Sequence, residues 1–386
     1  MKIKLFIIPV LFAIVFNCET PAQPGFDFSG YAQNFTVYQT IPQSLSEIFH
    51  SDKSFITDLL RIRLKPVIFL WHGGRLNIDY ELNVNYFNRK FIYENLSVTT
   101  NRRTVTSLFW SPVNEDKIKI NHFIDRLYFR QKLAFGNIKI GRQRIAWGTG
   151  RIWNSTDLFN PINPAAYYLI EKPGADAVSA KIRFGNFTDL NIVYNPVDNF
   201  NKYNFGGRFR TNFLGYDFSI MGGRFDEKTI VGLDFAGNIF DAGFRGEGIY
   251  SIDPDNSGNN FLKFIVGIDY QFTPKLYMLA EYHFNGEGKT DKYHYEFSRL
   301  LHGEIQNVSR NYLAVSGMYE LTPLLLLNAL SIFNLNDNSG FISVSGNYSV
   351  TENFYVNLGT QIFWGEKLSE YWFFPDSYYI QTEYYF

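Results

Sequence analysis

Hydrophobic and polar residues alternate along most of this chain. The clearest case is residues 76–86, LNIDYELNVNY, in which apolar residues occupy the even positions and polar residues the odd ones. A period of two places successive side chains on opposite faces of a β-strand. A strand that crosses a lipid bilayer needs roughly 9–11 residues, which is the length of this stretch. The pattern therefore predicts a membrane-spanning strand with one apolar face and one wet face.

Similar segments recur up to the C-terminus, and the connections between them are alternately short and long. The predicted strands are residues 25–39, 53–69, 74–88, 119–134, 136–146, 173–184, 187–195, 202–213, 215–225, 228–236, 240–250, 261–271, 275–286, 309–320, 324–335, 340–350, 353–364 and 376–386, which makes 18. Residues 228–236 and 324–335 alternate weakly, so 16 strands is the alternative. The short connections carry turn-forming residues such as Gly, Pro and Asn.

Short turns at one end and long loops at the other are typical of transmembrane β-barrels, which have an even number of strands. In lipid every backbone N–H and C=O needs an internal partner, and only helices and closed barrels provide one. No segment of the sequence is long and apolar enough for a spanning helix. We therefore predict an all-β chain that forms one transmembrane antiparallel β-barrel over residues 23–386, with both termini at the periplasmic end.

The composition agrees with a barrel that meets lipid outside and water inside. Aromatic residues make up 18% of the chain and charged residues only 19%, which is typical of neither a soluble domain nor a helical membrane protein. The formal net charge of −1 gives the whole molecule no bias toward nucleic acid.

The N-terminus predicts a secretory signal peptide at residues 1–22. Two lysines precede an apolar run at residues 5–16, which is too short to span a bilayer as a helix. Small residues suit cleavage after Ala22, and lipidation at Cys18 is the alternative. Cys18 is the only cysteine, so a chain without its signal has no disulfide and no thiolate metal site.

The last ten residues, SYYIQTEYYF, predict the closing strand of the barrel. Tyr378, Ile380, Tyr384 and Phe386 share one face, which Thr382 interrupts with a polar side chain. The segment resembles the closing strand of bacterial outer-membrane barrels, which ends in an aromatic residue. The resemblance implies an outer-membrane location, contact with outer-membrane lipid and recognition of Phe386 by the barrel-assembly machinery. As the edge strand of a soluble protein, this segment would expose a row of aromatic residues.

Charged side chains gather on the faces that alternation turns away from lipid. Residues 50–150 hold 17 Lys and Arg against 8 Asp and Glu, whereas residues 151–386 hold 17 against 26. A Lys or Arg on the lipid face costs roughly 2–4 kcal/mol at mid-membrane, so these side chains should point into the lumen. The predicted pore-lining residues are Arg61, Arg63, Lys65, Asp79, Glu81, Arg126, Arg130, Lys132, Arg142, Arg144 and Arg151.

These charges have two interpretations. Opposed charges on neighbouring strands, such as residues 61–65 and 79–81, can stiffen a water-filled interior. The excess of Arg can instead form a positive strip that attracts anions, since a narrow low-dielectric pore strengthens such a field. By alternation, Ile140 falls on the same strand face as Arg142 and Arg144. A positive strip in the lumen therefore needs a bulge or an early membrane boundary, which would turn these arginines inward while Ile140 faces lipid.

Residues 147–172 are the predicted constriction loop. They follow the fifth predicted strand, and this place resembles the one at which porins send a loop inward. Their Gly, Asn and Pro residues suit a loop that holds its shape. A loop folded over the barrel rim is the alternative.

The segment that leads into this loop carries a short motif. Its residues are Gly141, Arg142, Gln143, Trp147, Gly150 and Arg151. The motif resembles the "GRQ" strand of alginate-export-type barrels, and the resemblance implies passage of an anionic polysaccharide. Aromatic residues near the loops suit either a stacking track for sugar rings or an interfacial girdle. They are Trp147, Trp153, Trp364, Tyr371, Trp372, Phe373 and Phe374.

The sequence gives no sign of an enzyme or of a cofactor. Residues 282–286, YHFNG, superficially resemble an outer-membrane phospholipase pattern but lack the Ser nucleophile, and the six histidines show no paired metal spacing. We predict a porin-like outer-membrane channel for small or polymeric polar solutes, anionic or saccharide. The alternative is a non-conducting barrel that binds or anchors surface polysaccharide or another partner. The oligomeric state is open.

Overall fold

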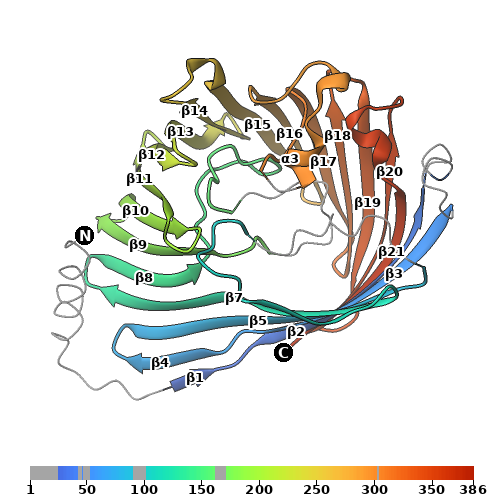
Figure 1. Ribbon diagram of the computed structural model, residues 1–386, viewed down its shortest axis with the longest axis horizontal. Helices are drawn as coiled ribbons and strands as arrows, with labels where there is room; N and C mark the ends of the chain where they lie inside the picture. The colour runs from blue at the N-terminus through green and yellow to red at the C-terminus, as the bar shows by residue number, and fades with distance from the viewer. Residues whose placement is uncertain (1–24, 42–45, 47–52, 90–100, 161–170, 302–303) are drawn as a thin grey trace.

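The computed structural model describes residues 25–41, 46, 53–89, 101–160, 171–301 and 304–386. The predicted signal peptide, with its alternatives of cleavage after Ala22 and lipidation at Cys18, lies outside these residues. Among the residues described, no helix is long and apolar enough to cross a membrane. Strands make up most of them (Figure 1).

Strands follow one another along the described part of the chain. Those of the first half are β1 (Gly25–Asp27), β2 (Gly30–Thr40), β3 (Ser54–Leu64), β4 (Val67–Trp71), β5 (Gly74–Phe87), β6 (Phe109–Asn114), β7 (Ile118–Leu133), β8 (Gly136–Gln143), β9 (Ala175–Phe184) and β10 (Thr188–Val197). Those of the second half are β11 (Lys202–Phe213), β12 (Tyr216–Phe225), β13 (Lys228–Ile239), β14 (Ala242–Ile252), β15 (Phe261–Thr273), β16 (Leu276–Asn285), β17 (Asn311–Thr322), β18 (Leu325–Asn334), β19 (Ser339–Ser349), β20 (Phe354–Trp364) and β21 (Asp376–Tyr385). Helix α3 (Phe297–Leu301) and 3-10 turns at Ser257–Asn259, Lys292–His294 and Glu370–Phe373 lie in the long connections.

The strands close into a ring. Of the 21 strands, β1, β4 and β6 are short pieces that extend the wall, and the remaining 18 pair antiparallel in sequence order. The last strand, β21, pairs with β2, with Tyr31 opposite Tyr385, so the ring of described strands is closed. The prediction of 18 antiparallel strands is confirmed. The two weakly alternating segments form β13 and β18, because each has strand partners on both sides.

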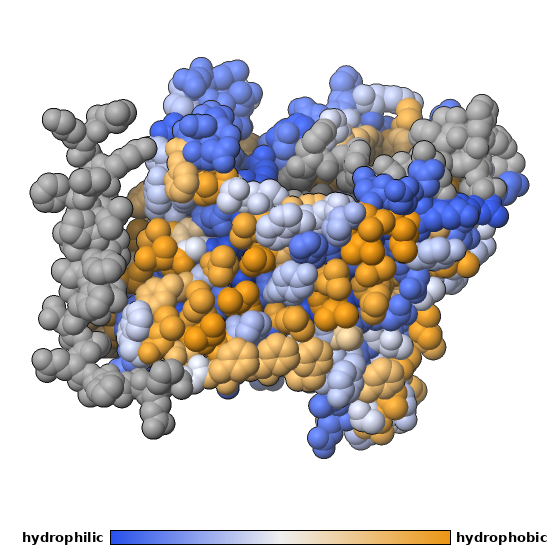
Figure 2. Space-filling view, turned by 60° about the horizontal axis from the view of Figure 1, so that its bottom comes forward, coloured by the Kyte–Doolittle hydropathy of each residue, from blue (hydrophilic) through white to orange (hydrophobic). Residues whose placement is uncertain are grey.

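The outer face of this ring is apolar and the inner face is polar. On β12 and β13, Ile220 and Leu233 are 61% and 60% exposed on the outside, whereas Asp234 is 2% exposed on the inside and Glu281 of β16 is fully buried. Figure 2 shows one side of the outer wall, with hydrophobic residues gathered across its middle. The alternation of the sequence is therefore the alternation between the outer wall and the lumen.

The two ends of the barrel differ. Tight turns such as residues 72–73 and 185–187 join the strands at one end, which we call the short-turn end. Long connections join them at the other, which we call the long-loop end. A bulge on β7 changes the parity of that strand part-way between the two ends. Asp79 lies opposite Arg126 and Tyr80 opposite Ile124, so Asp125 is the extra residue.

One wall strand stops early. The prediction extended the fifth strand to residue 146, but β8 ends at Gln143, where the chain turns into the barrel. The chain that precedes β7 fills the space above it. The N–H of Ile124 donates to the carbonyl of Leu108, and the N–H of Asp176 donates to the carbonyl of Arg103, both at 3.0 Å. Residues 103–108 therefore bridge β7 and β9 where β8 is absent.

Candidate functional site in the lumen

Residues 144–160, which follow β8, lie inside the barrel (Figure 1), and residues 161–170 of the predicted constriction loop lie outside the described residues. Two carboxylates of the far wall hold its backbone. Glu247 on β14 accepts hydrogen bonds from the N–H groups of residues 149–150 and of Thr156. Glu281 on β16 accepts hydrogen bonds from the N–H groups of residues 151–153, at 2.7–3.2 Å. Each carboxyl group therefore satisfies three backbone donors.

Two glycines allow this close approach. Gly148 has φ +98°, and a Cβ there would lie 2.2 Å from Oδ1 of Asn154 and 2.4 Å from Oε2 of Glu247. A Cβ on Gly150 would lie 1.9 Å from the carbonyl oxygen of Trp153. Only glycine fits either position without a shift of the backbone.

Apolar side chains of the loop pack against the inner wall. Ile145, Trp147 and Phe159 form one buried cluster with Ala175, Ala177, Val193, Met221, Phe225, Ile230 and Ile249. Trp153 forms a second with Ile265, Tyr312, Ala314, Ile332, Phe341 and Tyr371. Trp147 and Trp153 are 3% and 1% exposed. Their rings therefore leave no face for a sugar, and instead they anchor the loop to the wall by burying large aromatic surfaces.

Most of the predicted pore-lining charges form a buried network centred on Arg63. Its guanidinium contacts Asp79 at 3.0 Å, Glu81 at 2.9 Å and Glu171 at 3.3 Å, and also contacts Asp125. The network is completed by Arg61, which pairs with Glu81, by Arg126, which pairs with Asp125, and by Lys65, which pairs with Glu171. Four basic and four acidic residues meet here, so the network adds no net charge to the lumen.

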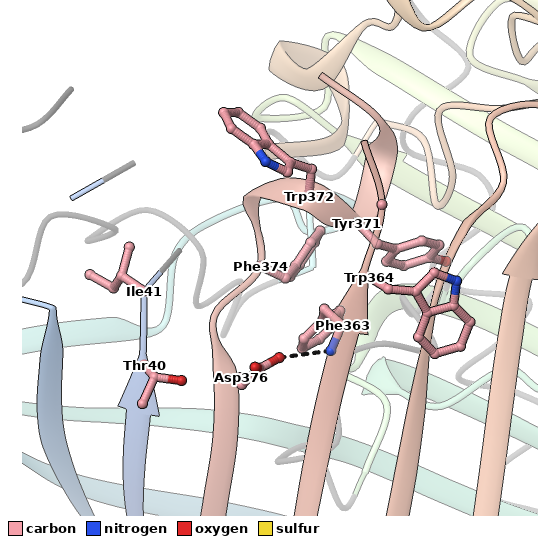
Figure 3. Close-up of a pocket in the computed structure, with 9 residues that line it drawn as sticks. Thr40, Ile41, Phe363, Trp364, Tyr371, Trp372, Phe374 and Asp376 are labelled. Atoms are coloured by element: carbon pink, nitrogen blue, oxygen red, sulfur yellow. Dashed lines mark hydrogen bonds between the residues drawn. The ribbon is translucent and has the colours of Figure 1, made fainter. Parts of the chain in front are cut away.

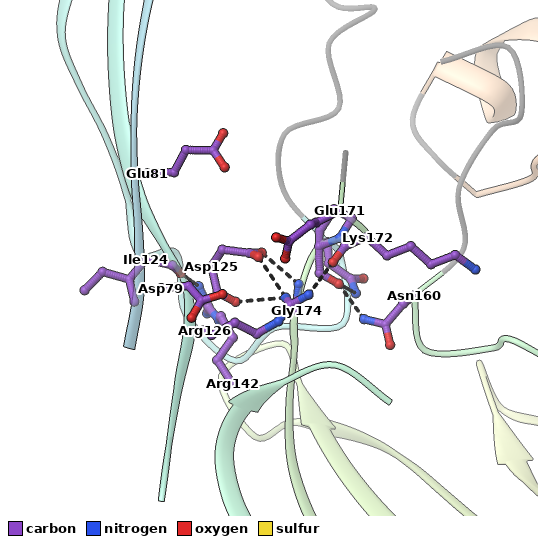
Figure 4. Close-up of polar contacts among 12 residues, drawn as sticks. Asp79, Glu81, Ile124, Asp125, Arg126, Arg142, Asn160, Glu171, Lys172 and Gly174 are labelled. Carbon is purple, nitrogen blue, oxygen red and sulfur yellow. Dashed lines mark hydrogen bonds and ion pairs between the residues drawn. The ribbon is translucent and has the colours of Figure 1, made fainter. Parts of the chain in front are cut away.

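Three of these carboxylates converge. Asp79, Asp125 and Glu171 each place a carboxylate oxygen within 4.8 Å of the others (Figure 4). Such a group can hold a divalent cation. Here Arg63 contacts all three and supplies the positive charge, so a metal ion would have to displace a buried guanidinium.

A second set of basic residues lies nearer the short-turn end. This basic cluster comprises Arg75 on β5, Arg130 on β7, Lys139 on β8, and Lys181 and Arg183 on β9. Within the described part of the chain, Lys181 is the only member of this cluster that forms an ion pair. Its partner is Asp189, which also pairs with Arg210. Arg130 and Lys139 each lie close enough to several other positively charged side chains to be repelled by them, and Nε of Arg130 has no hydrogen-bond partner among the described residues. The cluster is therefore a region of uncompensated positive charge.

The other predicted residues belong to neither group as defined above. Lys132 is exposed on the inner face of β7. Arg142 shares the outer-face parity of Ile140 and lies within the wall, where it pairs with Asp176 at 2.8 Å and donates to the carbonyl of Thr106 at 2.6 Å. It thus fills the space above the end of β8 rather than adding to a strip in the lumen.

The arginines of the loop are exposed. Arg144 precedes the segment whose backbone binds the two wall carboxylates, and Arg151 lies within that segment. Both side chains are open to solvent. Ile145 and Trp147 point to the wall, so alternation places Arg144 on the opposite side of the loop. These two arginines add positive charge to the surface of the loop.

At the long-loop end, Glu370 is buried in the connection between β20 and β21. Its carboxylate accepts hydrogen bonds from the hydroxyl of Tyr312 at 2.6 Å and from Nδ2 of Asn334 at 2.9 Å. Its backbone N–H donates to Asp337 at 2.9 Å. Burial, reinforced by the nearby Asp337 carboxylate, raises the pKa of Glu370 to about 7, although the Tyr312 hydrogen bond acts in the opposite direction.

An aromatic pocket of about 300 Å³ lies at the same end, between β20, β21 and the end of β2 (Figure 3). It is lined by Thr40, Ile41, Phe363, Trp364, Gly365, Tyr371, Trp372, Phe374 and Asp376. Several of the aromatic residues predicted as a sugar-stacking track therefore meet here. Phe373 packs elsewhere, edge-on against Phe297.

Sequence reasoning missed several of the residues that organise the lumen. Glu247 and Glu281 were not singled out, because their partners are backbone N–H groups. Nearly every residue has such a group, so no particular residue type in the sequence marks the donor. Lys181 and Arg183 share a face opposite apolar residues, which predicts that they point into the lumen, but they are not among the pore-lining residues named above. Arg75 carries the same signal at the start of the clearest alternating strand.

Comparison with known proteins supports the fold alone. No family model and no curated protein sequence matches the chain. Among solved structures, a BenF-like porin from Pseudomonas fluorescens Pf-5 is similar, with a TM-score of 0.57 and 10% sequence identity over 94% of this chain and 98% of that one. Pseudomonas aeruginosa OccK8 (OprE) is similar over the same shares, with a TM-score of 0.56 and 10% identity. The chain thus has the architecture of bacterial porins, whereas the resemblance to alginate-export-type barrels stays a prediction.

Gly150→Ala should release the loop from the far wall. The added methyl group would overlap the Trp153 carbonyl, so the N–H groups held by Glu247 and Glu281 must move. We expect hydrogen exchange of amides 149–156 to become at least about tenfold faster, which corresponds to about 1.4 kcal/mol of local stability. Gly317→Ala on β17 is the control, because a Cβ there meets nothing within 4 Å. Equal exchange in both variants would contradict this account.

Acid should stabilise the Glu370 segment. A carboxyl whose pKa is raised on folding contributes stability that is fully present below its unfolded value of 4.5 and is lost as the pH rises through about 7. The change amounts to about 3 kcal/mol. Hydrogen exchange of residues 366–375, corrected for the intrinsic pH dependence, should therefore accelerate between pH 5 and 7.5.

The matched variants of this prediction are Glu370→Gln and Glu366→Gln. The first should remove the pH dependence, because the amide does not titrate. The second should retain it, because Glu366 is exposed on the same segment. A wild-type pH dependence in Glu370→Gln would show that another group titrates.

Proposed function

We propose that this chain is a porin-type channel of a bacterial outer membrane, and that its solutes are polar and preferentially anionic. The closed barrel with an apolar exterior and a charged lumen supports passage of solutes through lipid. The loop at residues 144–160, packed against the inner wall, supports a narrowed lumen. The architecture shared with porins favours transport over catalysis.

The basic cluster carries the proposal of anion preference. The network around Arg63 is neutral, and most other inward charges are paired, as Arg208 is with Asp234 and Arg245 with Asp269. The cluster at the short-turn end therefore dominates the field in that part of the lumen. Guanidinium groups stay charged at any working pH and bind carboxylates and phosphates in bidentate fashion. An anion that enters would find several equivalent sites in succession.

The location follows from the same features. The outer wall needs lipid, and the C-terminal strand β21, which is followed by Phe386 beside β2, suits recognition by the barrel-assembly machinery. Charged solutes, rather than nucleic acid, fit a lumen whose positive charge is confined to one region.

A second candidate is a non-conducting barrel that binds surface saccharide. The observation in its favour is the aromatic pocket at the long-loop end, because exposed indole faces such as that of Trp364 can stack on sugar rings. Planar-bilayer recording separates the two functions. Steady single-channel conductance supports the channel, and an intact barrel without conductance supports the binder.

Selectivity tests the basic cluster directly. In a salt gradient, the wild-type channel should show a reversal potential of the sign that indicates anion preference. Arg75→Ala combined with Arg130→Ala should lower the anion-to-cation permeability ratio at least about threefold, because a charge about 4 Å from an ion contributes on the order of 1 kcal/mol even in water. The measurement is the reversal potential of single channels in planar bilayers.

Arg224→Ala is the matched control for charge removal. Arg224 lies opposite Phe205 on the outer face and covers the ring of Tyr203, so it does not contact the lumen. Its loss should leave the reversal potential unchanged. Cation preference in the wild type, or equal selectivity in the Arg75 and Arg130 double variant, would remove the proposal of anion preference.

A further inference from the structure

The wall has a notch at its long-loop end, above the start of β21. The last residue pair between β2 and β21 is Thr40 with Asp376, and the last pair between β20 and β21 is Gln361 with Ser377. Strand β20 continues beyond this pair to Trp364. Above Asp376, a gap one strand wide therefore separates the end of β2 from the end of β20.

Residues 365–375 turn inward instead of filling this gap. Tyr371 is buried, and its ring packs against those of Phe341 and Phe363, with centroids 5.4 and 6.3 Å away. The ring of Phe374 stacks on that of Phe363 at 5.1 Å. The notch is thus bordered by aromatic rings where a strand would otherwise complete the wall.

The aromatic pocket described above occupies this notch. Figure 3 shows Thr40 and Ile41 on one side and Phe363 and Trp364 on the other, with Asp376 between them. The volume of about 300 Å³ is that of a small-molecule site. Five of the nine lining residues are aromatic, namely Phe363, Trp364, Tyr371, Trp372 and Phe374.

Asp376 is the only charged residue among those that line the pocket. Its Oδ1 accepts a hydrogen bond from the N–H of Phe363 at 2.8 Å and so replaces a backbone partner for the end of β20. Among the described residues, no Lys, Arg or His pairs with this carboxylate. A carboxylate has about four acceptor sites, so Asp376 keeps its negative charge and free acceptor sites beside the rings.

We propose that this pocket binds a small organic cation of the alkylammonium class, as a free solute. Aromatic faces attract a cation that lies within about 6 Å of the ring centroid, and the unpaired carboxylate of Asp376 adds a charge of the opposite sign. The methyl or methylene groups of such a cation suit the apolar faces of the rings.

The charge of the pocket separates this ligand from the other classes. A neutral sugar can stack on the same rings, but it gains no electrostatic attraction from Asp376. An anion is repelled by that carboxylate. The pocket therefore differs in preference from the basic cluster at the short-turn end. It opens at the rim, so binding there does not depend on conductance through the lumen.

Isothermal titration of the purified full-length protein tests the class of ligand. The probes are choline chloride and 3,3-dimethyl-1-butanol, an uncharged analogue of similar shape, in a polyoxyethylene detergent that carries neither ammonium nor sugar. Choline should bind at least about tenfold more tightly than the alcohol. Equal affinities, no binding of choline, or tighter binding of maltose than of choline would overturn the proposal. Competition by a short-chain phosphatidylethanolamine would assign the site to a lipid headgroup and overturn the free solute.

Two variants locate the binding. Asp376→Asn keeps the acceptor for the Phe363 N–H and removes the charge, so it should weaken choline binding at least about fivefold. Trp372→Leu removes an indole ring and should weaken binding at least about threefold, while the circular dichroism of both variants stays that of a folded barrel. Glu366→Gln is the matched control, because Glu366 is an exposed acid of the same segment outside the pocket.

An unchanged affinity in Asp376→Asn would overturn the proposal. An equal loss in Glu366→Gln would also overturn it, because general surface charge would then account for the binding. Conductance separates this inference from the proposed channel. A conducting barrel that does not bind choline refutes the cation site alone, and a barrel that binds choline without conducting refutes the channel alone.

Discussion

The two wall carboxylates that bind the backbone of the inner loop determine how the interior of this barrel is divided. A loop inside a barrel has no neighbouring strand to pair with, and each buried N–H without a partner costs about 1–3 kcal/mol. Glu247 and Glu281 provide six hydrogen bonds to such groups. The loop in return covers apolar side chains of the wall, such as Met221 and Ile249, which would otherwise face water. Loop and wall therefore stabilise each other.

Charge in the lumen follows a similar division between paired and unpaired groups. Around Arg63 every charge has a partner, and the desolvation of buried ions is offset only by such complete pairing. A network of this kind is stiff and attracts no solute. The five residues of the basic cluster have one acidic partner among the described residues, Asp189, so the cluster keeps a net positive charge. The paired and the unpaired arginines are thus distinguished by what surrounds them, since both groups lie on inward faces of neighbouring strands.

The strands could be predicted from the sequence because inward and outward residues alternate, and because each short turn marks a register. The details that shape the lumen could not. The bulge at Asp125 leaves no mark in the composition of β7, yet it turns both Asp125 and Arg126 inward. The alternation of side chains along β8 did predict that Arg142 lies on the same face as Ile140, and the structure places it there, paired with Asp176. Which arginines are neutralised depends on contacts between segments far apart in the chain, such as Glu171 with Arg63.

Residues 103–108 have a consequence for how the barrel is assembled. Strands joined as successive hairpins can add to a growing sheet one at a time, because each new strand finds its partner next to it in the chain. Beside β7 this order is broken. The part of the wall beyond the end of β8 is completed by residues 103–108, which precede β7 in the chain and are hydrogen-bonded on their other side to Asp176 of β9. Contacts between distant segments form slowly, because the chain between them must first be ordered. We therefore expect the hydrogen bonds of residues 103–108 to form late in the assembly of the barrel, after the inner loop is in place.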